Sequence, residues 1–114
     1  MPIEMKFSSN TDIGQALVVG YALPQPIVLV TLSELGRKKT KEEIEKSLLN
    51  SMREINNTLD SFEKIEKVVV IKEEWTILND LLTPSMKIKR NEVEKLFQTD
   101  YEKWFEIKPD VIWQ

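Results

Sequence analysis

The chain has 114 residues, with 16 Lys and Arg against 19 Asp and Glu, a formal charge of -3, and neither cysteine nor histidine. Without thiols and imidazoles the sequence excludes disulfides, zinc sites built from Cys or His, Cys nucleophiles and catalytic triads with a histidine base. The mildly acidic balance argues against bulk binding to nucleic acid or to an anionic membrane. The length favours a single domain over residues 1–114, and any catalysis must use Lys, Arg, carboxylates, hydroxyls or backbone groups.

The chain carries no signal for membrane insertion or export. The longest apolar runs, residues 27–30 and 68–71, are far shorter than the roughly 20 residues of a spanning helix. The N-terminus lacks a charged-then-apolar leader pattern. We therefore expect a soluble, cytoplasmic protein without a transmembrane segment, and we expect no metal site.

The first third of the chain predicts a short helix and two strands. Pro2 suits the first turn of a helix near the N-terminus. Residues 13–20 and 27–32 are short, apolar and β-branched, and a segment rich in Gly and Pro separates them. This pattern predicts two strands joined by a tight connection.

The clearest helix begins at Thr40, whose hydroxyl can cap the first turn while Glu43 reaches back to the cap amide. The apolar positions that follow share one helical face: Ile44, Leu48, Met52, Ile55 and Leu59. Residues 67–72 then form a β-branched run typical of a strand buried on both faces. We therefore expect an α+β fold with a small mixed sheet of about three strands: a β-hairpin, then a helix crossover, expected to be right-handed, to a third strand.

Helices should flank this sheet, and the last of them is predicted near the C-terminus. Asn91 and Glu94 form a possible capping pair, and Pro109 ends the helix, so the final residues are expected to fray. The apolar positions at helical spacing are Val93, Leu96, Phe97, Tyr101, Trp104 and Phe105.

Residues 83–90 are the most unusual segment. If the segment is locally extended, Met86 and Ile88 anchor one side while Lys87 and Lys89 project from the other. Two ammonium groups on flexible stems suit an anionic ligand. The alternative is solvated charge, because basic residues before a helix are usually exposed and contribute little.

Residues 55–65, 68–71 and 82–90 together resemble the C-terminal domain of AMP-forming acyl-CoA synthetases, in particular the long-chain fatty-acid-CoA ligase branch. The most telling part is the pattern Leu-Thr-Pro-x-x-Lys-x-Lys-Arg at residues 82–90. The resemblance implies a small lid on a larger N-terminal domain that binds ATP and the fatty acid and that this chain lacks. Such a lid rotates between an adenylate-forming and a thioester-forming state.

By this resemblance Lys87 takes the position of the family's adenylation lysine, which bridges acyl carboxylate and α-phosphate oxygens. Lys89 and Arg90 match the pattern as supporting residues for the substrate phosphate. The resemblance also implies ATP, Mg²⁺ and CoA for the full enzyme, with ATP, fatty acid and CoA at the interface with the N-terminal adenylation domain. It implies that this chain alone is inactive. Asn56 and Glu63 match motif positions without a derivable role.

The chain departs from the family pattern in three places. Leu81 stands where an acidic residue often precedes the Leu-Thr-Pro. Met86 stands where many relatives outside the long-chain branch carry glycine. Residues 36–39 mimic the family's Gly-Arg-x-Lys hinge motif but follow the second strand, so they are predicted to be a solvated connector.

Two alternatives stay open. One is a stand-alone interaction module that binds a partner through the apolar, aromatic face of the last helix. The other is a weak anion or nucleotide binder that uses Lys87, Lys89 and Arg90 without catalysis.

Overall fold

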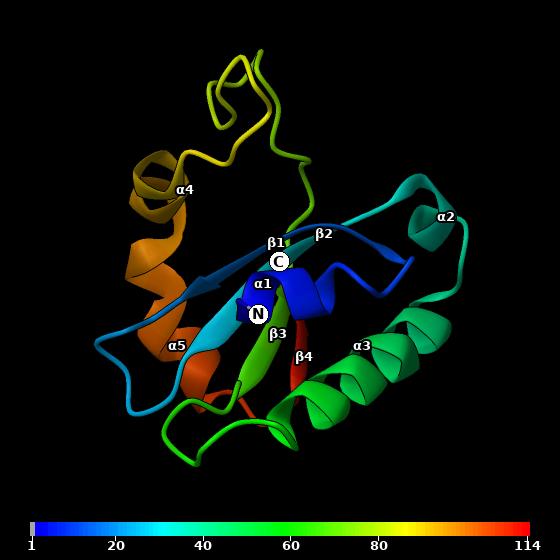
Figure 1. Ribbon diagram of the computed structural model, residues 1–114, viewed down its shortest axis with the longest axis vertical. Helices are drawn as coiled ribbons and strands as arrows, with labels where there is room; N and C mark the ends of the chain where they lie inside the picture. Colours follow the sequence, from blue (N-terminus) through cyan, green and yellow to red (C-terminus); the bar gives the residue numbers. More distant parts are fainter. Residues whose placement is uncertain (1) are drawn as a thin grey trace.

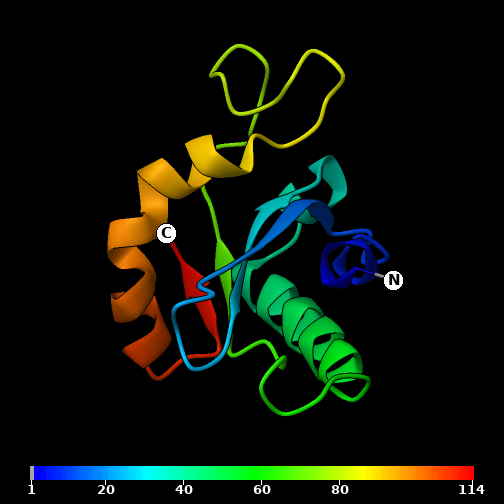
Figure 2. The same ribbon diagram turned by 60° about the vertical axis from the view of Figure 1, so that its left-hand side comes forward.

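The computed structural model describes residues 2–114 and has an α+β architecture, as predicted. The strands are β1 (Ile13–Val19), β2 (Ile27–Leu32), β3 (Lys67–Val70) and β4 (Val111–Trp113), in one sheet of the order β1-β2-β3-β4. The helices are α1 (Ile3–Phe7), α2 (Glu34–Arg37), α3 (Lys41–Asn56), α4 (Arg90–Phe97) and α5 (Tyr101–Glu106), with the 3-10 turn η1 (Gln98–Asp100) between the last two. Figure 2 shows α1 and α3 on one side of the sheet and α4 and α5 on the other.

The predicted hairpin and crossover are both present. β1 and β2 pair antiparallel, and Gly20 opens their connection with a φ of +83°, a conformation that favours glycine. β2 and β3 pair parallel, with α3 between them in the chain. The predicted capping box at the start of α3 is formed by Thr40 and Glu43. Leu59 lies beyond the end of that helix but still packs against the core.

The central strands are buried on both faces because alternate side chains enter two separate apolar layers. Val28 and Val30 face the layer that contains Ile44 and Leu48 of α3. Ile27, Leu29 and Val69 belong to the opposite layer, which α4 and α5 cover. The sheet is therefore the middle of three layers.

The predicted fraying of the C-terminus is wrong, because the last residues form β4, a fourth strand parallel to β3. Lys67 holds the turn before this strand: the residue is 3% exposed, and its ammonium donates to the carbonyls of Lys108 (3.2 Å) and Pro109 (2.9 Å). A strand of three residues is too short for a periodic sequence signal. β4 adopts its extended conformation because it pairs with β3.

The single predicted C-terminal helix is instead two helices, because the 3-10 turn η1 interrupts it. The proposed cap is also wrong, since α4 begins at Arg90 without a side-chain cap. Phe97, Tyr101 and Trp104 are each at most 8% exposed and pack against the sheet. The aromatic face that an interaction module would use is therefore internal.

Candidate functional site

Residues 76–89, here called the lysine loop, project away from the sheet between β3 and α4 (Figure 1). Figure 2 shows that the loop consists of two neighbouring turns. Its first end is tied to β1 by Gln15, whose side-chain amide donates to the Trp75 carbonyl at 2.8 Å and accepts from the Trp75 amide at 3.0 Å. The Trp75 side chain is 1% exposed, so the loop leaves the body from a fixed point.

Arg90 fastens the second end of the loop to the same strand. Its guanidinium donates to the Val18 carbonyl at 2.6 Å and to Glu4 Oε2 at 2.8 Å. That carboxylate oxygen also accepts from the Val18 amide at 2.8 Å. Arg90 and Glu4 thus satisfy both backbone groups of Val18 at the open edge of the sheet, where unpaired groups would otherwise need water.

A compact turn presents Lys87. The Thr83 amide donates to the Lys87 carbonyl and the Met86 amide donates to the Thr83 carbonyl, both at 2.8 Å. The Lys87 amide in turn donates to the Thr83 hydroxyl at 3.0 Å. Pro84 occupies the second position of this turn, where its fixed φ is favourable. Leu82 and Ile88 pair on either side and close the turn.

The predicted alternation of the segment is wrong at Met86. This residue has a φ of +68° and is 65% exposed, whereas Ile88 packs against the core. A left-handed residue reverses the chain, so strict alternation of an extended segment cannot hold across it. The same φ gives a physical reason why glycine suits this position.

The three basic side chains of the motif have different surroundings. Lys89 forms an ion pair with Asp80 at 2.5 Å, and Arg90 is engaged with Glu4. The Lys87 side chain is exposed and has no hydrogen-bond or ion-pair partner anywhere in residues 2–114. The structure therefore does not present a three-cation cluster for a loosely bound anion, and it leaves one ammonium uncommitted on the outer turn.

The segment that resembles a hinge motif, residues 36–39, begins in the last turn of α2, and its basic residues Arg37, Lys38 and Lys39 are exposed, as expected of a solvated connector. Lys39 forms an ion pair with Asp12 at 2.7 Å, Arg37 lies 3.8 Å from Glu74, and Lys41 lies over the Trp113 ring. These contacts are structural.

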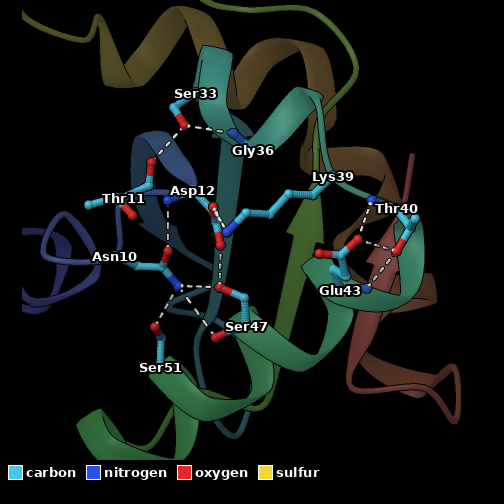
Figure 3. Close-up of polar contacts among 10 residues, drawn as sticks. All are labelled: Asn10, Thr11, Asp12, Ser33, Gly36, Lys39, Thr40, Glu43, Ser47 and Ser51. Carbon is cyan, nitrogen blue, oxygen red and sulfur yellow. Dashed lines mark hydrogen bonds and ion pairs between the residues drawn. The ribbon is translucent and has the colours of Figure 1, made fainter.

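A buried polar cluster centred on Asp12 was not predicted from the sequence. Asp12 is 3% exposed and accepts a hydrogen bond of 2.7 Å from the Ser47 hydroxyl, as Figure 3 shows. The Lys39 side chain, followed by Ser47, holds the pKa of Asp12 below its usual range. Asn10 donates to the hydroxyls of Ser47 and Ser51. The cluster joins the segment before β1 to α3, and its members are too far apart in sequence to form a recognisable motif.

Gly36 allows α2 to approach this cluster. A Cβ atom at Gly36 would lie 2.4 Å from the Asp12 carbonyl oxygen, a distance that real Cβ atoms do not adopt. Ser33 caps the helix by accepting from the Gly36 amide, and its own hydroxyl donates to the Thr11 carbonyl.

Asn56 has a structural role that the motif alone did not reveal. Its side-chain amide donates to the Ile65 carbonyl at 2.9 Å, and its carbonyl oxygen accepts from the Ile65 amide at 2.8 Å. The residue joins the end of α3 to the segment that leads into β3.

Within residues 2–114 no group of three or more acidic, His or Cys side chains is arranged to hold a metal ion. Among the helices of the same part of the chain, none combines the length and apolar character needed to cross a bilayer.

The chain is thus a small α+β domain with a four-stranded mixed sheet, helices on both faces and a loop with basic residues between β3 and α4. The family model described as "AMP-binding enzyme C-terminal domain" matches residues 1–108. The chain belongs to this family.

Two groups of proteins are similar to the chain. It is 32% identical over 101 residues to long-chain-fatty-acid--CoA ligase 5 of Mus musculus, and this match covers 81% of this chain and 15% of that protein. It is 26% identical over 102 residues to long-chain-fatty-acid--CoA ligase 6 of Homo sapiens, and this match covers 82% of this chain and 15% of that protein. The chain thus spans about 15% of the length of these relatives.

The fold is shared with solved structures of lower sequence identity. The A-PCP didomain of carboxylic acid reductase from Segniliparus rugosus, in complex with AMP, superposes with a TM-score of 0.73 at 20% identity, covering 89% of this chain and 15% of that chain. The adenylation domain of a carboxylate reductase from Mycobacterium chelonae superposes with a TM-score of 0.70 at 17% sequence identity. This match covers 92% of this chain and 17% of that chain.

Proposed function

We propose that this chain is the lid of an ATP-dependent long-chain fatty-acid-CoA ligase and that Lys87 is its adenylation lysine. The observation that carries the proposal is the uncommitted Lys87 ammonium on a turn whose base is fixed to β1. The long-chain ligases among the relatives support the substrate class. A larger adenylation domain holds ATP and the fatty acid, and the lid closes over it.

The first half-reaction needs a mobile cation. A carboxylate oxygen of the fatty acid forms a bond to the α-phosphorus of ATP, the bond from that phosphorus to the bridging oxygen breaks, and pyrophosphate leaves. Negative charge builds up on oxygens of both reactants during this step. The Lys87 ammonium stabilises that charge while the lid is closed, in a site that excludes water.

The second half-reaction does not need this lysine. The thiol of CoA attacks the acyl carbon, loses its proton to a base outside this chain, and AMP leaves to give the thioester. Mg²⁺, which the adenylation step requires in this scheme, is held with ATP by the larger domain, because the described residues offer no acidic cluster for it. The lid alone is therefore inactive, and the complete enzyme works in the cytoplasm.

Lys89 and Arg90 support the reaction by fixing the loop. Their contacts with Asp80 and Glu4 keep them away from the Lys87 ammonium. We expect them to act as positioning residues, without direct contact to the phosphate.

The test is Lys87→Ala in a mixture of this chain and the adenylation domain of its own enzyme. The rate of adenylate formation, measured as the release of pyrophosphate, should fall by about 10²- to 10³-fold. This is the usual loss when one preorganised charge-stabilising donor is removed. Thioester formation from preformed acyl-adenylate and CoA should be unchanged. Lys46→Ala, an exposed lysine on α3, is the matched control. Full adenylation activity of Lys87→Ala, or loss of thioester formation alone, would exclude the assignment.

A further inference from the structure

The lysine loop exposes a second, apolar feature on the turn beside Lys87. The Leu78 side chain is 99% exposed, and Ile77 next to it is 48% exposed. Met86, on the turn that presents the lysine, is 65% exposed. A single exposed leucine is common on protein surfaces. Here, however, three large apolar side chains share one projecting loop.

The turn that carries Leu78 is rigid, so its exposure is not the result of a loose segment. Asn79 accepts from the Thr76 amide at 2.9 Å and donates to the Glu74 carbonyl at 2.9 Å. The Thr76 hydroxyl accepts from the Asn79 amide at 3.1 Å, and the Asp80 amide donates to the Ile77 carbonyl at 3.1 Å. This network holds the Leu78 side chain in water.

The Leu78 turn and the Lys87 turn are joined as one body. The Lys89 amide donates to the Leu81 carbonyl at 2.9 Å, and the Lys89 ammonium pairs with Asp80. Asp80 and Met86 both adopt left-handed backbone conformations, with φ of 66° and 68°. Such strain is retained where the surroundings require one conformation, and it gathers at functional sites. Because the two turns are neighbours at the outer end of the loop (Figure 2), a surface that receives the Lys87 turn also lies close to the Leu78 turn.

We infer that Leu78 is a docking residue that seats the lysine loop in an apolar hollow of the adenylation domain during adenylate formation. The inference rests on the proposed function. The rigid link to Lys87 argues for this occupant over a second copy of the chain or a lipid surface. Coverage of about 15% of the relatives' length leaves a large remainder to provide the hollow. Leu78 touches neither substrate nor ATP, so it is a positioning residue.

The energetic effect follows from the exposed area. Burial of a fully exposed leucine stabilises an association by about 1.5 to 3 kcal/mol, and each 1.4 kcal/mol is a factor of 10. Leu78→Ser should therefore raise the lid concentration needed for half-maximal adenylation by about tenfold or more. The maximal rate at saturating lid should be kept, because Lys87 is intact.

The experiment titrates this chain into the adenylation domain of its own enzyme and records pyrophosphate release. It compares Leu78→Ser, Leu78→Met, Leu35→Ser and Lys87→Ala. Leu78→Met should leave the lid concentration for half-maximal adenylation at its wild-type value, because methionine keeps a large apolar side chain. Leu35, 51% exposed on α2, is the matched control for loss of an exposed leucine. Leu78→Ser should keep the wild-type melting temperature, since its side chain is almost completely exposed.

The outcomes separate the inference from the proposed function. If Lys87→Ala lowers the maximal rate while Leu78→Ser leaves the half-maximal concentration unchanged, the docking role is refuted and the function stands. If Lys87→Ala keeps the full rate, the proposed function fails. If Leu78→Ser abolishes self-association or binding to phosphatidylcholine vesicles but not complementation, another occupant covers Leu78 and the inference is overturned.

Discussion

Replacing Asp12 by asparagine should lower the free energy of unfolding at pH 7 by about 2 kcal/mol. Asp12 is 3% exposed, and its carboxylate accepts from Ser47 at 2.7 Å and pairs with Lys39 at 2.7 Å. Hydrogen bonds to charged groups contribute about 1.5 to 3 kcal/mol each. Part of this is recovered because asparagine still accepts from Ser47 and because the Lys39 side chain, 35% exposed, returns to water. At about 4 °C for each kcal/mol, the melting temperature should fall by about 8 °C.

The effect should depend on pH in a defined direction. Because Lys39 and Ser47 lower the pKa of Asp12 from its ordinary value of 3.8, the unfolded chain binds this proton more readily than the folded chain. The stabilisation of the fold by the ionised Asp12 carboxylate is fully present above pH 3.8, and it is lost as the pH falls through the lower pKa of the folded state. Urea unfolding of both proteins at several pH values should show their difference shrinking below about pH 4.

A matched control is Asp60→Asn, because Asp60 is exposed. It should change the free energy of unfolding by less than about 0.5 kcal/mol at every pH. A difference between Asp12→Asn and wild type that stays constant from pH 7 to strong acid, or an equal loss from Asp60→Asn, would refute the reasoning.

Gly36→Ala should destabilise the fold by about 2 kcal/mol in urea unfolding, because its Cβ would overlap the Asp12 carbonyl oxygen. Gly14→Ala, whose tightest contact is 3.2 Å, should be milder, and the reverse order would contradict the explanation. Met86→Gly should keep adenylation within about twofold, because glycine accepts the left-handed backbone. Met86→Val should lower adenylation by about tenfold, since a β-branched residue resists that conformation, and equal activities of the two variants would show that the turn is not required.

The sequence by itself determined the elements whose signals are local. The capping box at Thr40 and Glu43, the apolar stripe of α3 and the β-branched run of β3 are each written within a few residues. Backbone hydrogen bonding and side-chain periodicity act over these short distances, so the hairpin and the crossover could be predicted. The motif at residues 82–90 likewise indicated the family before any geometry was known.

Elements that depend on a distant partner could not be predicted in this way. β4 is regular because β3 pairs with it across some 40 residues of intervening chain, as the contact of Lys67 with Pro109 illustrates. Helix propensity did not place the 3-10 turn that divides the last helix, because aromatic packing against the sheet decides where that helix bends.

The candidate site shows the same division. The motif identifies three basic residues without indicating how their surroundings differ. The tertiary structure shows which of them have partners. Arg90 meets Glu4, which lies 86 positions away, and Lys89 meets Asp80. Lys87 finds no partner within residues 2–114. Sequence spacing fixes which charges the loop carries, whereas their pairing depends on which chain segments the fold brings within hydrogen-bond distance. Of the three basic residues of the motif, this leaves only Lys87 unpaired within residues 2–114.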